Sequence, residues 1–149
     1  MAPGPKSTPT ARPAFSKEER AAMRETVRER RSRARSDPAE SEREVLAKIA
    51  EMAPEDRTIA EKIHALVRTH APGLAPRTWY GMPAYANASG QVICFFRDAR
   101  KFKERYATLG FGEGARLDSG RMWATSFALT ELTPAVEAEI ASLLQRAVR

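Results

Sequence analysis

The chain has 149 residues, 42% of them apolar, which is enough for one domain with its own core, and its single cysteine excludes an internal disulfide or a cysteine-based zinc site. It carries 25 Lys and Arg against 19 Asp and Glu, a net charge of +6. Because no apolar run approaches the ~20 residues of a membrane span and the N-terminus has no apolar signal-peptide centre, we expect a cytoplasmic protein.

The positive charge is concentrated near the N-terminus. Residues 1–40 contain 10 basic and 6 acidic side chains, whereas residues 41–149 contain 15 and 13. Residues 1–14 are rich in Pro, Ala, Thr and Ser, which predicts a disordered tail. Ser16 and Glu19 form a capping box that predicts a solvated, Arg-rich helix over 17–35. We therefore expect a tail and helical arm over 1–36 and a folded α+β domain over 37–149.

Two interpretations of this arm stay open. Its arginines could neutralise nucleic-acid phosphates, each contact adding salt-dependent affinity. Alternatively, the arm is a charged helix that keeps the protein soluble or packs by one edge on the domain. No aromatic residues are interleaved with the arginines, so the arm has no apparatus for reading bases. The arginines of the first interpretation are Arg24, Arg28, Arg31 and Arg35.

Three further helices are expected in the domain. Asp37 caps the first, with Pro38 at its first helical position. Pro54 opens the second, which should end near His70 because an Ala-Pro-Gly sequence follows. The third begins at Thr133 and runs to the C-terminus. Their apolar residues at helical spacing are Val45, Leu46, Ile49, Met52, Ile59, Ile63, Leu66, Val67, Val136, Ile140, Leu143, Leu144 and Ala147.

Between His70 and Thr133 the apolar pattern changes to a period of two with Gly-rich turns, which predicts strands. Extended pieces are expected at 79–80, 84–86, 92–96, 102–109 and 122–129, with 92–96 at the centre because it is apolar on both faces. Short connections favour antiparallel pairing, and the helices precede and follow the strands in the chain. The predicted fold class is therefore α+β, a small antiparallel sheet packed with N-terminal and C-terminal helices.

The densest group of rings and turn formers is the segment 79–85, Trp-Tyr-Gly-Met-Pro-Ala-Tyr. We expect it to fold back as a stiff corner whose rings line an open hollow, with Phe95 among its neighbours. Basic residues nearby would add charge complementarity, so the hollow suits a planar or anionic ligand. The alternative is that the tryptophans only anchor the sheet to the helices. The predicted ligand-binding residues are Trp79, Tyr80, Met82, Tyr85, Lys101, Arg105, Tyr106 and Trp123.

No catalytic set is apparent beside this segment. His64 and His70 are six positions apart on one predicted helix, which separates them by about 120° around its axis and excludes a shared metal ion. Cys94 lies within the most apolar strand, where a thiol behaves as a small buried hydrophobe. Glu104 and Asp118 are the only carboxylates expected near the rings, and both lie in solvated contexts. The sequence therefore favours a protein that is not an enzyme.

The segment 78–85, Thr-Trp-Tyr-Gly-Met-Pro-Ala-Tyr, follows a Pro-opened helix and resembles the signature of the YdhG-like domain of unknown function. The similarity continues through 90–96, 101–106 and 123–148. It implies a compact α+β fold, and some members of that family are described as frataxin-like iron chaperones. The resemblance raises iron as a cofactor or cargo, for which hard oxygen ligands are suited. The carboxylates that would hold it are Glu51, Glu55, Asp56 and Glu61.

The leading hypothesis is thus a non-enzymatic, cytoplasmic binding or chaperone-type protein for a small anionic or aromatic ligand, or for iron. The alternative hypothesis is a nucleic-acid-associated module that binds through the basic N-terminal arm. Neither hypothesis involves a membrane, and both leave the oligomeric state open.

Overall fold

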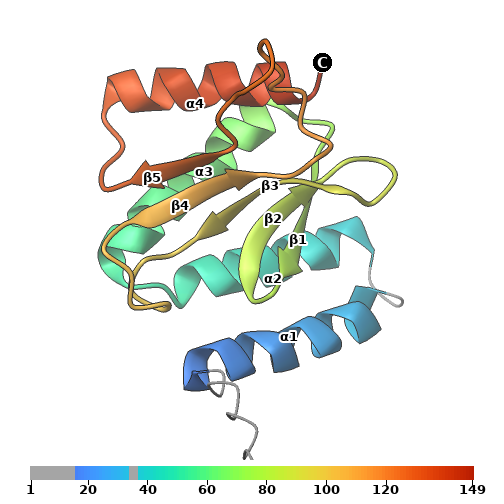
Figure 1. Cartoon of the computed structure of the whole chain (residues 1–149). Coiled ribbons are helices and arrows are strands. Elements are labelled where there is room, and N and C mark those ends of the chain that lie inside the picture. The colour runs from blue at the N-terminus through green and yellow to red at the C-terminus, as the bar shows by residue number, and fades with distance from the viewer. Residues whose placement is uncertain (1–15, 34–36) are drawn as a thin grey trace, which may run out of the picture.

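The structure is a computed structural model that describes residues 16–33 and 37–149, with side chains for all of these except 30–33. In this part of the chain, five strands form one antiparallel sheet accompanied by four helices, which confirms the predicted α+β class (Figure 1). The predicted tail at 1–14 lies outside the described residues. None of the described helices is long and apolar enough to cross a membrane. The elements are α1 (Lys17–Arg33), α2 (Pro38–Ala50), α3 (Pro54–His70), β1 (Ala75–Trp79), β2 (Met82–Ala86), β3 (Val92–Arg97), β4 (Ala107–Phe111), β5 (Ser126–Leu129) and α4 (Pro134–Ala147).

Local capping explains where the helices of the domain begin. Asp37 Oδ1 accepts the N–H of Glu40 at 2.8 Å, and Thr133 Oγ1 accepts the N–H of Val136 at 3.3 Å. Each of α2, α3 and α4 has a proline in its first turn, where a missing N–H breaks no intrahelical hydrogen bond. The three predicted helix starts are therefore confirmed.

The strands follow one another in chain order across the sheet, β1-β2-β3-β4-β5, and every neighbouring pair is antiparallel. The central position predicted for β3 is confirmed, but strand bounds differ from those predicted. Strand β1 already starts at Ala75, and residues 122–125 precede β5 as irregular chain. Residues 102–106 form turns instead of extending β4, because Lys103 has a left-handed φ of 54° and the Glu104 N–H turns back to the Ala99 carbonyl at 2.9 Å.

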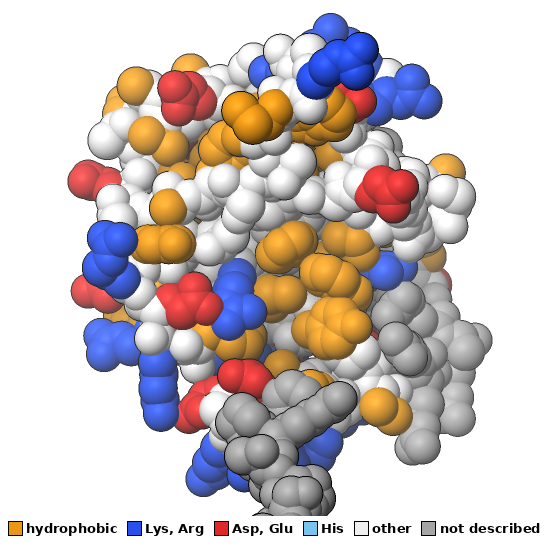
Figure 2. All heavy atoms as spheres, viewed as in Figure 1, with side chains coloured by type: hydrophobic (Ala, Val, Ile, Leu, Met, Phe, Trp, Pro, Cys, Tyr) orange, Lys and Arg blue, Asp and Glu red, His pale blue; other side chains and the backbone are white. Residues whose placement is uncertain are grey.

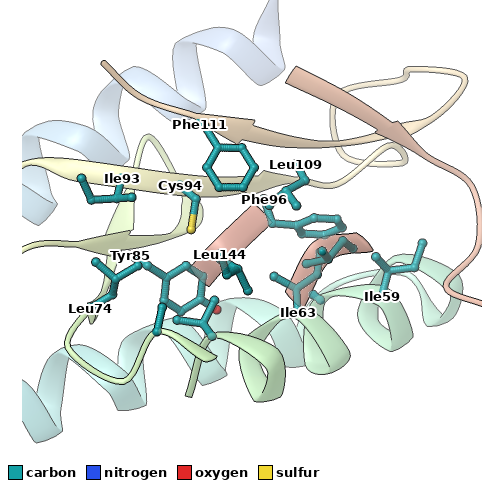
Figure 3. Packing of buried hydrophobic residues seen from close by; sticks show 14 of the residues in the cluster. Ile59, Ile63, Leu74, Tyr85, Ile93, Cys94, Phe96, Leu109, Phe111 and Leu144 are labelled. Carbon is teal, nitrogen blue, oxygen red and sulfur yellow. The ribbon is translucent and has the colours of Figure 1, made fainter. Parts of the chain in front are cut away.

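One face of the sheet packs on the helices and forms the core. Cross-strand pairing places Tyr85, Cys94 and Phe111 in one row, and Phe96 and Leu109 in the next. All five side chains are more than nine-tenths buried. Figure 3 shows them between the strands and the helices. Helices α2, α3 and α4 all contribute to this core, through Val45, Ile49, Ile59, Ile63, Val67, Ile140 and Leu144.

The opposite face of the sheet, here called the outer face, carries a different row of side chains. Arg77, Ala84, Phe95, Gly110 and Ser126 are successive cross-strand partners from β1 to β5. Because side chains alternate along a strand, this row points away from α2, α3 and α4. In the view of Figures 1 and 2, α2 and α3 lie behind the strands, and a group of hydrophobic side chains is exposed over the strands, with charged side chains beside it.

Helix α1 packs by one face against the β1–β2 hairpin. Ala22, Thr26 and Glu29 are buried, and Glu29 Oε1 accepts the N–H of Gly81 at 3.0 Å. The expectation of a solvated helix is therefore wrong for this face of α1, and the expected packing by one edge on the domain is confirmed. The physical reason is that small and acidic residues share one face of α1 and can be buried against the hairpin.

Candidate ligand-binding face

Trp79 and Tyr80 are held by a two-residue turn between β1 and β2. Trp79 pairs with Met82, so Tyr80 and Gly81 alone form the turn. Their φ angles are positive, 51° and 75°, as a type I′ hairpin turn requires. Glycine adopts this conformation without strain, and the short connection holds Tyr80 in it as well. The predicted corner at this place is confirmed.

Three rings from this corner and from β3 form a cluster on the outer face. The ring centre of Trp79 lies 4.8 Å from that of Tyr80 and 5.2 Å from that of Phe95. The Phe95 ring lies over Gly110, since a Cβ added at Gly110 would come within 2.2 Å of it. Tyr80 is 37% exposed, and the other two rings are partly exposed. Trp79, Tyr80 and Phe95 are called the aromatic face below.

A cation borders the aromatic face on β3. Arg97 lies two residues after Phe95, so its side chain leaves the same side of the sheet. Its guanidinium carbon is 4.0 Å from the ring centre of Phe102, and Nη2 is 2.6 Å from Glu104 Oε1. Its Nε is buried without a hydrogen-bond partner. A guanidinium has five N–H donors, so this contact leaves donors for an anionic group.

Tyr85 does not belong to the aromatic face. It is 1% exposed, and its hydroxyl lies 2.9 Å from His64 Nδ1, whose other ring nitrogen lies 3.2 Å from Glu42 Oε1. Burial raises the pKa of the Tyr85 hydroxyl and lowers the pKa of His64. The prediction that Tyr85 lines an open hollow is wrong, because it pairs with Pro76, an odd number of positions from Trp79 and so on the core face.

The structure scatters most other residues of the predicted hollow. Met82 lies opposite Trp79 in the hairpin but is only 5% exposed. Tyr106 contacts its own neighbour Arg105, whose guanidinium carbon is 5.2 Å from the ring centre. Trp123 is 39% exposed in the irregular chain before β5, and none of the ring contacts among the described residues involves it. The expected hollow lined by all of these residues is therefore not formed. Of the predicted ligand-binding residues, only Trp79 and Tyr80 belong to the aromatic face.

Lys101 lies on the α1 side of the corner, beside two glutamates that sequence reasoning missed. Its Nζ is 3.4 Å from the Gly81 carbonyl and 3.7 Å from Glu25 Oε2. Burial raises the pKa of the Glu29 carboxyl, although the Gly81 N–H and the Thr78 hydroxyl act to lower it. The signal that could have found both glutamates is a face of small and acidic residues at helical spacing on an otherwise Arg-rich helix.

The carboxylates expected to hold iron do not gather. Asp56 is 6% exposed, and its Oδ2 accepts a backbone N–H from the loop after β3 at 3.0 Å. Glu51 pairs instead with a lysine three residues earlier, at 3.8 Å. In the described part of the chain, no group of three or more His, Cys, Asp or Glu side chains could hold a metal ion. The predicted site is therefore wrong, because Asp56 turns inward while the other three stay exposed, namely Glu51, Glu55 and Glu61.

Two further features of the molecule lie apart from the aromatic face. Cys94 is fully buried, and burial raises the pKa of its thiol to about 12, so the predicted core role is confirmed. A cavity of about 630 Å³ lies between the C-terminal ends of α3 and α4 and the β2–β3 turn. Its lining includes Gln91, Arg116 and Asp118 but none of the predicted ligand-binding residues, all of which are described.

Fold and site together define a two-layer α+β domain with an aromatic sheet face that its helices leave uncovered. In comparisons with known proteins, no family model, no curated protein and no solved structure matches the chain. The resemblance to the YdhG-like domain therefore rests on the residues of this sequence alone.

Proposed function

We propose that this protein is a non-enzymatic binding module that holds a planar, anionic small molecule against the aromatic face. The observation that carries the proposal is the cluster of Trp79, Tyr80 and Phe95 on the side of the sheet away from α2, α3 and α4. Exposed rings gathered in one place are typical of interaction sites, and they supply flat contact area. A cytoplasmic location, argued from composition, belongs to the same proposal.

The neighbours of Phe95 favour a flat ligand over a bulky one. Its cross-strand partners on the outer face are Ala84 and Gly110, and Ser126 follows in the same row. Ala84 and Gly110 are buried, so the exposed part of this surface is formed by the flat rings themselves, which a planar molecule can contact by stacking. Arg97 at the border supplies the charge for an anionic substituent.

Fluorescence of Trp79 tests this proposal. In a Trp123→Phe background Trp79 is the only tryptophan left, so its emission reports on the aromatic face. We expect adenosine 5′-monophosphate to quench it saturably, and adenosine or ribose 5-phosphate to bind more weakly. Phe95→Ala should weaken binding about 5- to 150-fold, since stacking of a base on an aromatic side chain contributes ~1–3 kcal/mol.

Tyr106→Ala is the matched control, because this ring lies outside the aromatic face. It should leave the affinity unchanged. Equal losses in the Phe95→Ala and Tyr106→Ala variants, or no quenching by any of the three compounds, would contradict the proposal.

A second candidate function, single-stranded nucleic-acid binding through α1, is favoured by how this helix distributes its charges. Glu25 and Glu29 face the domain, whereas Arg24 and Arg28 are exposed. The exposed side of α1 therefore carries a larger excess of positive charge than the helix as a whole. Of the other two predicted contact residues, Arg31 lies on α1 with its side chain outside the described part, and Arg35 lies outside the described residues.

Fluorescence anisotropy of a labelled oligonucleotide across a salt series tests this candidate. Arg24→Gln/Arg28→Gln should reduce the slope of log affinity against log salt by about 1.4, because each lost phosphate contact removes ~0.7 from the slope for a single strand. Arg116→Gln/Arg121→Gln, which removes two exposed arginines outside α1, is the control. Equal slopes for the two double variants would exclude binding through α1.

A further inference from the structure

The surface between α1 and the rest of the chain is built from charged groups on both sides. Glu25 Oε1 lies 3.1 Å from Lys48 Nζ, and Glu25 Oε2 lies 3.7 Å from Lys101 Nζ. One helical turn further along α1, Glu29 Oε1 accepts the N–H of Gly81 at 3.0 Å. This surface is called the α1 seam, and it comprises Glu25, Glu29, Lys48, Thr78, Gly81 and Lys101.

The groups that contact Glu25 and Glu29 across the seam are cations or hydrogen-bond donors. Lys48 comes from α2, Lys101 from the connection after β3, and the Gly81 N–H from the hairpin turn. The hydroxyl of Thr78 on β1 acts on Glu29 by a hydrogen bond that lowers the pKa of its carboxyl. Two ammonium groups, a backbone amide and a hydroxyl from four separate elements make a suitable site for an oxyanion.

In each of the two glutamates, one carboxylate oxygen accepts no hydrogen bond. Glu29 is 8% exposed, and its Oε2 is buried without a hydrogen-bond partner. Glu25 Oε2 is likewise buried without one. Burial raises the pKa of the Glu29 carboxyl, and the nearby charge of Glu25 adds to the rise. Keeping two carboxylates in one seam therefore costs free energy.

Space for an anion lies on both sides of Glu25. Both of the cavities there are lined by Glu25 and Lys48, so an ion that replaces the Glu25 carboxylate has room beside the lysine. The first, about 240 Å³, is also lined by Gly81, Arg100 and Lys101, and by the acidic residues Glu51 and Asp98. The second, about 250 Å³, is also lined by Arg28, Glu29 and Thr78, and by the acidic residue Glu44.

We propose that the α1 seam is a binding site for a phosphoryl group, as inorganic phosphate or a phosphate monoester, and that Glu25 and Glu29 occupy it when no such ligand is bound. A phosphate dianion concentrates its charge and its acceptor oxygens on one centre, between Lys48 and Lys101 and near the Gly81 N–H. Its binding displaces the glutamates and frees α1 from the hairpin. This site is separate from the aromatic face, so the proposal goes beyond the proposed function.

Isothermal titration calorimetry of the full chain with inorganic phosphate tests the proposal. Glu25→Gln/Glu29→Gln removes both competing charges and keeps the size and polarity of the side chains. We expect this variant to bind phosphate at least about tenfold more tightly than the natural chain. Adding Lys48→Met and Lys101→Met should abolish that gain, because these residues supply the two ammonium groups of the seam.

Glu18→Gln is the matched control, because Glu18 lies on the same helix and pairs with Lys103 at 3.0 Å outside the seam. It should bind phosphate like the natural chain. Equal affinities of the natural chain and the double variant overturn the proposal, as does a gain that survives loss of both lysines. If circular dichroism shows that the double variant has lost helix, Glu25→Gln alone carries the test, since it keeps the Glu29 to Gly81 hydrogen bond. Failure of glucose 6-phosphate to bind a variant that binds phosphate overturns the monoester part.

Discussion

The two faces of the sheet share the same five strands and differ in what their side chains contact. On the core face, Tyr85, Cys94 and Phe96 are at most 1% exposed and contact helices. On the outer face, Phe95 sits between small cross-strand partners and remains partly exposed beside Trp79. A large aromatic side chain is therefore enclosed on one face and remains partly accessible to solvent on the other.

Neighbouring phenylalanines on β3 give the largest expected contrast between the two faces. Phe96→Ala should lower the free energy of unfolding by about 3–5 kcal/mol, because it leaves a cavity in the core. Phe95→Ala should lower it by only about 1 kcal/mol, a typical loss away from the core. Urea unfolding followed by circular dichroism measures both. Equal losses would show that the outer face is also a packing surface.

Gly110 offers a second test of the difference between the two faces, because the ring of Phe95 packs directly on it. In Gly110→Ala the new Cβ would meet the Phe95 ring, so the ring must shift outward. We expect weaker quenching of Trp79 by adenosine 5′-monophosphate and a stability loss of about 1–2 kcal/mol, as for overpacking. Gly73→Ala, where an added Cβ meets nothing within 4 Å, is the control. Unchanged nucleotide affinity in Gly110→Ala would remove Phe95 from the site.

The last expected effect is the pH dependence of the core face. Burial lowers the pKa of His64, so the folded protein keeps it neutral while the unfolded chain takes up a proton as pH falls below about 6.5. Its contribution to stability is therefore complete above that pH and is lost on acidification. The natural chain should lose more stability than His64→Gln between pH 7 and 5, by no more than about 1.4 kcal/mol per pH unit. Urea midpoints at each pH measure this, and parallel curves would contradict it.

The fold could be predicted closely because its signals are local. Asp37 and Thr133 each precede a proline and cap the helix that follows. The Tyr80–Gly81 turn lies within the segment 79–85, which the sequence predicts as a corner. The candidate site was predicted only in part. Phe95 was expected near the corner, but Tyr85 was assigned to the wrong face, because the bounds of β1 decide which residues of β2 lie opposite Trp79.

Helix α1 also shows that a sequence pattern does not predict which residues make tertiary contacts. Its arginines dominate the sequence and predict a solvated arm, yet Glu25 and Glu29 decide how it packs, because Lys48, Lys101 and the Gly81 N–H meet them. These partners come from three segments that lie far apart in the chain. No pattern within the sequence of α1 predicts these partners.

By itself, the sequence determined the elements of this protein, their order, the antiparallel sheet and the corner at Trp79 and Tyr80. These depend on capping, periodicity and turn residues, which act over a few neighbouring positions. Only the tertiary structure decided which face of the sheet is covered, that Tyr85 faces His64, and that α1 rests on the hairpin. Such outcomes depend on strand register and on partners distant in the chain, where a shift of one residue exchanges a buried side chain for an exposed one.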